Sequence, residues 1–384
     1  MNAFTFQTTP SVLAEIGATA RIGSYLAERG CRKVAFVTDK TMLKLGLADA
    51  ALDGFRHAGL DVWTFSGVEP DPPETMILDA VARARGEGVD CVASVGGGSS
   101  LDTAKLIALL LNCDQPIDEM YGVNLVRGTR LPLVLAPTTA GTGSEVTPIS
   151  IVTTGTNEKK GIVAPQLLPD YAVLDAELTV GLPAAVTAAT GIDAMVHAIE
   201  AFTSKRLKNV VSDCLAKQAL QLLGANIRTA CTSPDDRDAR AQMLLGSMLA
   251  GMAFANAPVA AVHALAYPLG GHFHIPHGLS NALVLPYVLE YNLPEAAGDY
   301  AELGPIVFPA LVGKSRTERA EGLIEGFLKL GPELGMQSRL SELGVNHNHL
   351  PMLAEDAMKQ QRLLINNPRE MTLEAARDIY AKAL

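Results

Sequence analysis

The chain has 384 residues, of which 48% are hydrophobic and 19% charged. This composition excludes an intrinsically disordered chain, and the length favours two domains over a single core. The net charge of -10 and the pI near 5.3 argue against an extended basic face of the kind that binds nucleic acid or an anionic membrane. We therefore expect a folded, enzyme-sized protein that acts on small molecules.

The cysteines and the N-terminal residues bear on the cellular compartment. The cysteines are Cys31, Cys91, Cys113, Cys214 and Cys231. They form no C-x-x-C pair, which predicts free thiols in a reducing compartment rather than a disulfide framework or a zinc knuckle. No basic segment followed by an apolar one begins the sequence, so we expect no secretory signal. Both observations favour the cytoplasm.

The first half of the chain alternates short apolar segments with segments of helical period. This alternation is typical of βαβ units and a largely parallel sheet. The predicted strands are 33–39, 61–65, 90–95, 131–137 and 171–175, and the clearest helices are 75–86, 101–111, 210–230 and 373–383. The strand pattern stops after Leu182-Pro183. We therefore expect an α/β domain over residues 1–182 and an all-α domain over residues 183–384.

An uncharged run from Leu244 to Val262 has the length of a membrane-spanning helix. It is rich in Ala, Gly and Ser, contains Asn256 and Pro258, and leads directly into His263. This composition favours a helix buried closely against its neighbours, so we expect no membrane span.

A glycine-rich segment, Gly96-Gly97-Gly98-Ser99, joins the predicted strand 90–95 to the helix that follows. Glycines let a ligand approach the backbone, and a helix N-terminus offers unpaired N–H groups and the positive end of its dipole, which together suit a pyrophosphate. A tight turn that needs positive φ angles would explain the same glycines. The segment matches neither the Walker A loop nor the G-x-G-x-x-G fingerprint, so alone it favours neither explanation.

A second loop, residues 137–145, follows the predicted strand 131–137 and carries Thr138, Thr139 and Thr142. The carboxyl ends of strands in an open α/β sheet face the ligand crevice. We therefore predict that this loop and the glycine segment line one cofactor, rather than forming exposed turns.

Asp39 closes the first predicted strand. Its carboxylate could accept hydrogen bonds from a ribose and would repel the 2′-phosphate of NADP, which predicts NAD as the cofactor. Capping of the helix that begins near Thr41 explains Asp39 equally well.

Histidines gather in the second half, where four of the eight, His263, His272, His274 and His277, lie between residues 263 and 277. Spacing does not decide which of them bind a ligand. His272 and His274 alternate, so they could share one face of an extended segment as a rival metal pair. We favour a role for both in lining a pocket.

Asp193 and His197 are four residues apart in a segment with helical character, so both project from one helix face. Taken alone, they are better explained as a structural pair. The downstream histidines favour a metal site, because carboxylates and imidazoles bind divalent Fe, Zn, Ni or Co. Such an ion would act as a Lewis acid in hydride transfer.

In this order, the motifs resemble the iron-containing (group III) alcohol dehydrogenase family along nearly the whole chain. The matching segments are Val37-Thr38-Asp39-Lys40, the 96–100 loop, Thr138 to Glu145, Gly191 to Ala201, residues 263–277 and Asn367-Pro368-Arg369-Glu370. Several motifs in order are far more specific than any one of them. The resemblance implies a dehydroquinate-synthase-like fold, with an α/β dinucleotide-binding domain followed by a helical metal-binding domain.

The same resemblance implies the ligands of each cofactor. The implied metal ligands are Asp193, His197, His263 and His277, which leaves His272 and His274 as pocket residues. The implied NAD contacts are Asp39, Gly96, Gly97, Gly98, Ser99, Thr138, Thr139, Thr142 and Lys160. Fe²⁺ is the expected metal, with Zn²⁺ as the alternative.

This sequence departs from the family pattern in two places: Ser100 stands where many members have Pro, and Tyr267 where many have a histidine near the nicotinamide. Tyr267 follows His263 by four residues and would lie on the same helix face. We expect Tyr267 and His277 to be the catalytic residues. Tyr267 is explained equally well as a proton relay and as a buried tyrosine with one hydrogen-bond partner.

The expected function is a metal-dependent, NAD-linked alcohol dehydrogenase, or aldehyde or ketone reductase, for a small alcohol. Phe254 and Leu363 are expected as apolar pocket walls, which favours an uncharged substrate. The alternative is a hydroxyacid-oxoacid transhydrogenase or a hydroxyacid dehydrogenase using the same site. A non-catalytic nucleotide- or metal-binding protein is a further alternative, disfavoured because both loops and all four implied ligands are present. We expect a cytoplasmic homodimer.

Overall fold

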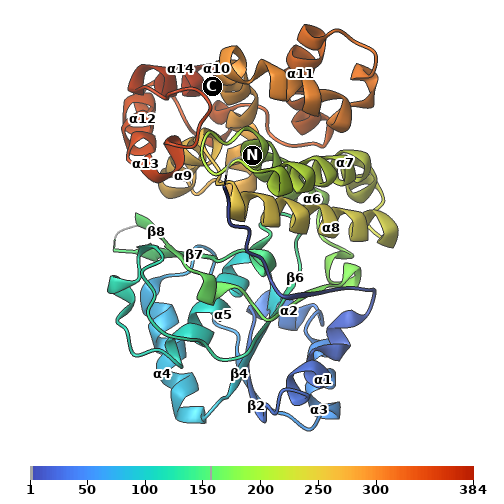
Figure 1. Cartoon of the computed structure of the whole chain (residues 1–384), viewed down its shortest axis with the longest axis vertical. Coiled ribbons are helices and arrows are strands. Elements are labelled where there is room, and N and C mark those ends of the chain that lie inside the picture. Colours follow the sequence, from blue (N-terminus) through green and yellow to red (C-terminus); the bar gives the residue numbers. More distant parts are fainter. Residues whose placement is uncertain (1–2, 156–157) are drawn as a thin grey trace. The chain divides into compact units, whose positions relative to one another are not determined.

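The computed structural model describes residues 3–155 and 158–384. They divide into two compact units, one of residues 7–180 and one of residues 181–384 together with residues 3–6 (Figure 1). The first unit contains the strands, whereas the regular elements of the second are helices. This combination of a parallel-sheet unit and a helical unit confirms the predicted fold class.

A six-stranded sheet with the order β1-β9-β6-β4-β2-β3 forms the centre of the first unit, and each neighbouring pair of strands is parallel. The strands are β1 (Ser11–Ala14), β2 (Lys33–Val37), β3 (Asp61–Phe65), β4 (Cys91–Gly96), β6 (Leu133–Pro137) and β9 (Tyr171–Leu174). All five predicted strands lie in this sheet. β1 was not predicted, because it is only four residues long and lies at the edge, where all of its side chains are at least partly exposed.

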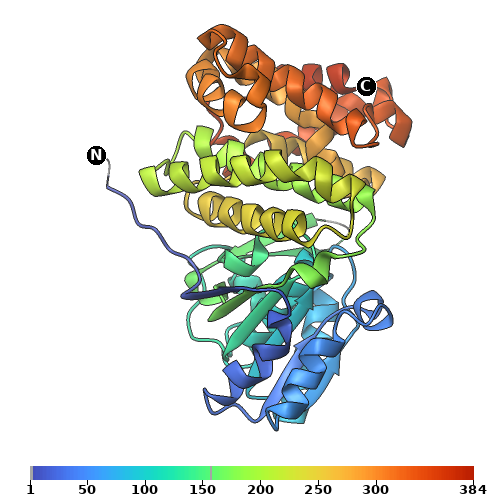
Figure 2. The same cartoon turned by 90° about the vertical axis from the view of Figure 1, so that its right-hand side faces the viewer.

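Helices pack on both faces of this sheet (Figures 1 and 2). They are α1 (Ile22–Ala27), α2 (Lys40–Lys44), α3 (Asp49–His57), α4 (Glu74–Glu87) and α5 (Gly98–Leu110). Val34 and Phe36 of β2 pack in one core with α1 and α3, whereas Ala35 and Val37 pack in the other core with α4 and α5. Burial on both faces is why the central strands read as continuous apolar runs.

A second, three-stranded sheet in the order β5-β8-β7 was not predicted. Its strands are β5 (Gly122–Val123), β7 (Ile149–Thr154) and β8 (Glu158–Val163). Lys160, an implied NAD contact in a stretch with no predicted strand, lies in β8 opposite Val152 of the antiparallel neighbour β7. Residues 156–157 between these strands lie outside the described residues.

The second unit is built from helices, among which α7 and α8 run side by side in Figure 2. They are α6 (Ala184–Thr203), α7 (Val210–Thr232), α8 (Arg237–Asn256), α9 (Ala261–Phe273), α10 (His277–Val307), α11 (Arg316–Glu333), α12 (Leu350–Met358), α13 (Gln361–Leu364) and α14 (Leu373–Ala383). A Cβ added at Gly246 of α8 would lie 2.8 Å from Leu223 of α7. The small residues of α8 therefore serve close helix packing, as its composition predicted.

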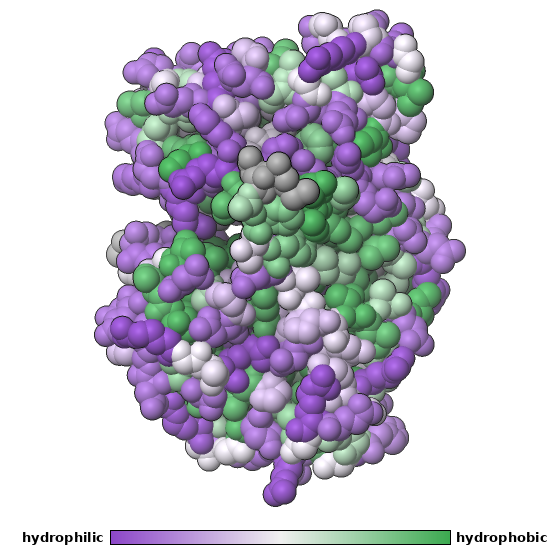
Figure 3. Space-filling view, in the orientation of Figure 1, coloured by the Kyte–Doolittle hydropathy of each residue, from purple (hydrophilic) through white to green (hydrophobic). Residues whose placement is uncertain are grey.

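No helix in the described part of the chain has, by itself, the length and hydrophobicity needed to cross a membrane. The consecutive helices α8 and α9 meet that requirement only together, and they are bent by 106° relative to one another. On the face shown in Figure 3, hydrophilic side chains predominate along the margins of both units. This is the distribution expected where two cores bury most of the large apolar residues.

Candidate functional site

Three helices of the second unit bring the predicted metal ligands to one place. Asp193 and His197 lie one turn apart on α6 and are both buried, as their spacing predicted. His263 lies in the first turn of α9, and His277 begins α10. Between them His274 adopts φ of 54°, an uncommon left-handed conformation that ends α9. The turn places the rings of His263 and His277 with their centroids 5.3 Å apart.

The ligand atoms of Asp193, His263 and His277 all lie within 4.8 Å of one another. Oδ1 of Asp193 is 3.8 Å from Nε2 of His263 and 3.7 Å from Nε2 of His277. The ring of His197 stacks on that of His263 with 4.7 Å between centroids. One carboxylate surrounded by imidazoles is a donor set that suits divalent iron or zinc, so these residues fit the expected metal.

Asp193 is the only carboxylate in this metal-ligating group. Burial raises the pKa of its carboxyl group. The charges of His197, His277 and His263 and a hydrogen bond from Asn281 outweigh burial and lower the pKa below its ordinary value. The carboxylate is therefore ionised at neutral pH, as a metal ligand must be.

Two buried residues that the sequence analysis did not single out contact these ligands. Oε2 of Glu200 lies 2.7 Å from Nδ1 of His263, and its Oε1 accepts a hydrogen bond from the backbone N–H of Val262, also at 2.7 Å. Burial lowers the pKa of His263, but Glu200 and Asp193 outweigh it and raise that pKa overall. Asn281 donates through Nδ2 to Oδ1 of Asp193 at 2.5 Å.

The helical spacing of Glu200 and Asn281 from predicted ligands could have indicated that they lie near the site. Glu200 follows His197 by three residues on α6, and Asn281 follows His277 by four residues on α10. Residues three or four apart share a helix face, so each was placed to reach the ligand that precedes it.

The structure places the remaining histidines outside the cluster. His272 lies in α9 rather than in an extended segment, and its exposed Nε2 contacts Oδ2 of Asp356 at 2.5 Å. His274 is exposed at the end of α9. The two therefore do not share one face of an extended strand, because helix α9 continues through His272.

Aromatic side chains flank the cluster. The half-buried ring of Tyr267 lies 5.9 Å from the ring of His277, and Phe254 stacks on His197 with 4.3 Å between centroids. Leu363 is buried in α13. Tyr267 and Phe254 therefore lie beside the metal-ligating residues.

The two predicted cofactor loops follow neighbouring strands of the first unit. Gly96 ends β4 and pairs with Pro137 at the end of β6, and the N–H of Thr138 donates to the carbonyl of Gly96 at 3.0 Å. Asp39 follows β2, the other neighbour of β4. The chain order reverses between β2 and β4, which is the position where open α/β sheets bind ligands.

Close contacts explain Gly96 and Gly98, and none of the three glycines has a positive φ angle. Gly97 caps the N-terminus of α5 with φ of -74°, and neither Gly96 nor Gly98 has a positive φ. A Cβ at Gly98 would lie 2.8 Å from Cγ2 of Thr142 in the second loop. The absence of a side chain thus lets the two loops approach one another.

Behind these loops lies the fully buried Lys105 of α5. Its Nζ donates to Oγ of Ser144 at 2.8 Å and to the carbonyl of Ile149 at 2.7 Å, and lies 3.4 Å from Oδ1 of Asp102. Burial lowers the pKa of the ammonium group, and the charge and hydrogen bond of Asp102 only partly offset this. Lys105 therefore ties the helix after the glycine loop to the second loop and to β7.

The other two predicted cofactor residues, Asp39 and Lys160, make contacts within the first unit. Oδ1 of Asp39 accepts hydrogen bonds from the N–H groups of Thr41 and Met42, so Asp39 caps α2. Lys160 pairs with Glu158 at 3.4 Å and lies 5.7 Å from the ring centre of Tyr121. Only Oδ1 takes part in these capping hydrogen bonds, and Oδ2 of Asp39 does not.

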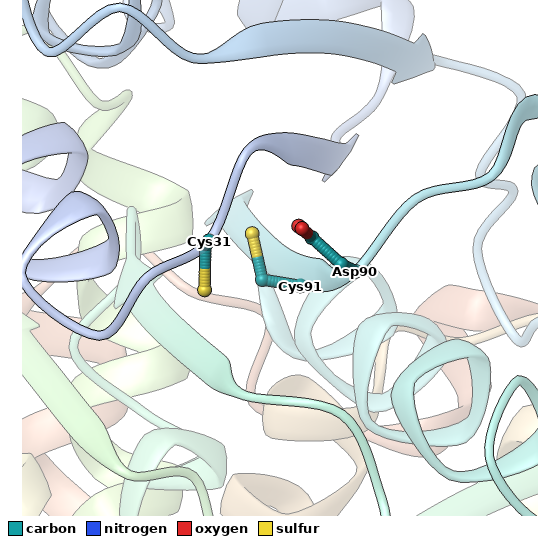
Figure 4. Close-up of side chains that lie close together, drawn as sticks. All are labelled: Cys31, Asp90 and Cys91. Carbon is teal, nitrogen blue, oxygen red and sulfur yellow. The ribbon is translucent and has the colours of Figure 1, made fainter.

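A second group of metal-ligating atoms comes from Cys31, Asp90 and Cys91 (Figure 4). It lies at the N-terminal ends of β2 and β4, whereas the cofactor loops follow the C-terminal ends of their strands. Burial raises the pKa of both thiols, so protonated sulfur is favoured over the thiolate that binds metals. The carboxylate of Asp90 already accepts hydrogen bonds from the N–H groups of Arg32 and Lys33. We interpret this group as part of the core.

Glu145, at the end of the second loop, predicts a pH effect on stability. Burial, partly offset by its backbone hydrogen bond and by Lys105, raises the pKa of this carboxyl group from 4.5 to about 7. Ionisation therefore costs more in the folded than in the unfolded state, so its contribution to stability is greatest below pH 4.5 and falls as the pH rises to about 7. Glu145→Gln should remove this loss, which amounts to ~3 kcal/mol at most. Unfolding of both proteins at pH 5 and pH 8 should show a larger gain of the variant over the wild type at pH 8 than at pH 5; an equal difference at both would contradict the assignment.

Known protein families, proteins and structures resemble this chain along nearly its whole length. The family model of iron-containing alcohol dehydrogenases matches residues 9–176, and the C-terminal model of that family matches residues 187–384. The chain is 39% identical to long-chain-alcohol dehydrogenase 1 of Geobacillus thermodenitrificans, over 96% of this chain and 93% of that protein. It is 33% identical to the NAD-dependent methanol dehydrogenase of Bacillus methanolicus, over 99% of each. A crystal structure of 1,3-propanediol oxidoreductase, 36% identical, superposes with a TM-score of 0.96 over all of both chains. The chain belongs to the iron-containing alcohol dehydrogenase family.

Proposed function

We propose that this protein is an NAD-dependent, iron-loaded alcohol dehydrogenase that interconverts a small uncharged alcohol and its aldehyde or ketone. The observation that carries the proposal is the convergence of the ligand atoms of Asp193, His263 and His277 within 4.8 Å in a member of this family. The proposed reaction is the reversible transfer of a hydride between the alcohol carbon and NAD.

We propose Asp193, His197, His263 and His277 as the metal ligands. When bound, the metal supplies a Lewis acid that polarises the substrate oxygen. The ionised Asp193 supplies the negative charge that a divalent cation requires, and the imidazoles of the buried His197 and His263 and of the exposed His277 would supply the nitrogen donors. Fe²⁺ is the proposed ion, and Zn²⁺ suits the same donors.

We propose that NAD binds at Asp39, Gly96, Gly97, Gly98, Ser99, Thr138, Thr139 and Thr142, with Lys160 as a further contact. NAD supplies the acceptor for the hydride. The N-terminus of α5, which begins at Gly98, offers N–H groups to the pyrophosphate. Lys105 and Asp102 keep the two loops together behind this position.

We propose that Phe254 and Leu363 contribute apolar walls for the substrate and that Tyr267 moves the alcohol proton. Phe254 lies against His197 and Tyr267 against His277, so each adjoins a proposed ligand. We also propose a cytoplasmic homodimer, which light scattering and cell fractionation would test.

The decisive experiment is a panel of aldehydes, ketones and alcohols, assayed on protein loaded anaerobically with Fe²⁺ or Zn²⁺. We expect stoichiometric NADH oxidation with small aldehydes in the metal-loaded protein and none after chelation. Turnover of a hydroxyacid with a ketoacid at catalytic NAD would identify a transhydrogenase instead. Binding of NADH and metal without any turnover would refute an enzymatic function.

The substitution Asp39→Asn should separate the capping role of Asp39 from its proposed role in cofactor choice. Asn caps helices as well as Asp does, so α2 should keep its hydrogen bonds while the negative charge is lost. Removing the repulsion of the 2′-phosphate should raise kcat/KM for NADP relative to NAD about tenfold or more. A cofactor ratio unchanged from the wild type, together with an unchanged Tm, would leave Asp39 as a cap alone.

A further inference from the structure

Glu200 holds two groups with its two carboxylate oxygens. Oε2 lies 2.7 Å from Nδ1 of His263, and Oε1 accepts the N–H of Val262, also at 2.7 Å. Glu200 and His263 are 4% and 2% exposed, so water does not compete for these bonds. The carboxylate therefore fixes the ring of His263 from the side opposite Nε2.

The chemistry of the pair selects one tautomer of His263. Nδ1 of His263 lies 2.7 Å from a carboxylate oxygen of Glu200, and a carboxylate oxygen in such a contact takes the part of acceptor, so the geometry places the ring proton on Nδ1. Nε2 is then left with its lone pair. The amide Nδ2 of Asn281 also lies 3.4 Å from this Nε2, but it donates to Oδ1 of Asp193 at 2.5 Å and lies closer to Nε2 of His277, at 3.2 Å. The contact with Glu200 therefore determines the tautomer.

Glu200 also connects two ligand-bearing helices. It lies on α6, which carries Asp193 and His197, and it binds an N–H in the first turn of α9, which carries His263. Helix N-termini have unpaired N–H groups and favour negative charge, which stabilises the buried carboxylate. One side chain thereby sets both the position of α9 against α6 and the protonation of the His263 ring.

We propose that Glu200 is a positioning residue that holds His263 with its proton on Nδ1, so that Nε2 is presented to the metal. The metal itself rests on the proposed function, whereas the tautomer is a property of the protein alone. Outer carboxylates that orient metal-binding histidines typically contribute 10- to 100-fold in metal affinity. Glu200 does not touch the substrate or cofactor in this proposal.

The test uses Glu200→Gln, which keeps the volume but replaces one acceptor oxygen by an amide donor. The Val262 N–H and the Nδ1 proton of His263 then compete for the remaining oxygen. We expect metal affinity, measured by competition with a chelator, to fall about 10- to 100-fold. We also expect the spectrum of the Co²⁺-loaded protein to change. Glu145→Gln, a second buried Glu-to-Gln change located in the other unit, should leave metal affinity unaltered.

Nitrogen NMR of the full-length, metal-free wild type, labelled at histidine, measures the tautomer directly. At a pH high enough for the ring to be neutral, we expect His263 to carry its single proton on Nδ1. A proton on Nε2 would overturn the proposal even if Glu200→Gln failed to fold, and so would a variant with wild-type metal affinity and Co²⁺ spectrum. Failure of the wild type to bind metal would instead refute the proposed function, while the tautomer measurement would still decide the role of Glu200.

Discussion

Replacing His277 by Ala is expected to lower metal affinity at least ~100-fold and to abolish turnover. Nε2 of His277 lies 3.7 Å from Oδ1 of Asp193, and its ring is the one that comes from α10. The variant retains ligands from α6 and α9 only, which leaves an incomplete set for an ion that requires about four donors. Metal content after dialysis and kcat with an aldehyde substrate would measure both effects.

His272→Ala is the matched control for this prediction. His272 belongs to the same histidine-rich segment, but its ring contacts Asp356 at the surface and lies outside the ligand cluster. The control should keep its metal content. Full metal occupancy and normal turnover in His277→Ala would show that the ligand assignment is wrong.

The fold was predictable wherever a residue pattern reports burial directly. Runs such as Lys33–Val37 and Leu133–Pro137 are buried on both faces of the sheet, so their apolar sequences identified them as strands. The strands β7 and β8 lacked that signal, because their burial alternates or is shallow and their pairing is set by each other. A short edge strand such as β1 likewise has too few buried side chains to form a pattern.

The site was predictable for residues whose chemistry is uncommon in a core. Asp193 and His197 stood out because a carboxylate and an imidazole share an otherwise apolar helix face. Glu200 is equally buried on that helix, but its partner His263 is 63 residues away in sequence, and only the packing of α6 against α9 brings them together. Helical spacing places Glu200 and Asn281 on the faces of the ligands, but it does not show which residues they bind; the partners of Asn281 and Lys105 are likewise distant in sequence.

Tyr267→Phe is expected to lower kcat by ~10²-fold while leaving folding and metal content intact. The half-buried Tyr267 ring lies 5.9 Å from that of the proposed ligand His277, and the substitution keeps the ring while it removes only the hydroxyl group. Positioned acid–base groups contribute ~10²- to 10⁴-fold to rates. If the hydroxyl group moves the alcohol proton, its removal should lower kcat by a factor in that range.

Tyr380→Phe provides the control for deleting a tyrosine hydroxyl near the same helix. The Tyr380 hydroxyl donates to the carbonyl of Leu265 on α9 at 2.6 Å, so its loss should cost about 1 kcal/mol of stability without changing kcat. The pH profile then separates a proton relay from a packing role for Tyr267. A relay predicts that the profile of alcohol oxidation changes with the loss of the phenol, because the proton must leave by another route. Wild-type kcat with an unchanged profile in Tyr267→Phe would exclude the relay and reduce Tyr267 to a ring that packs on His277.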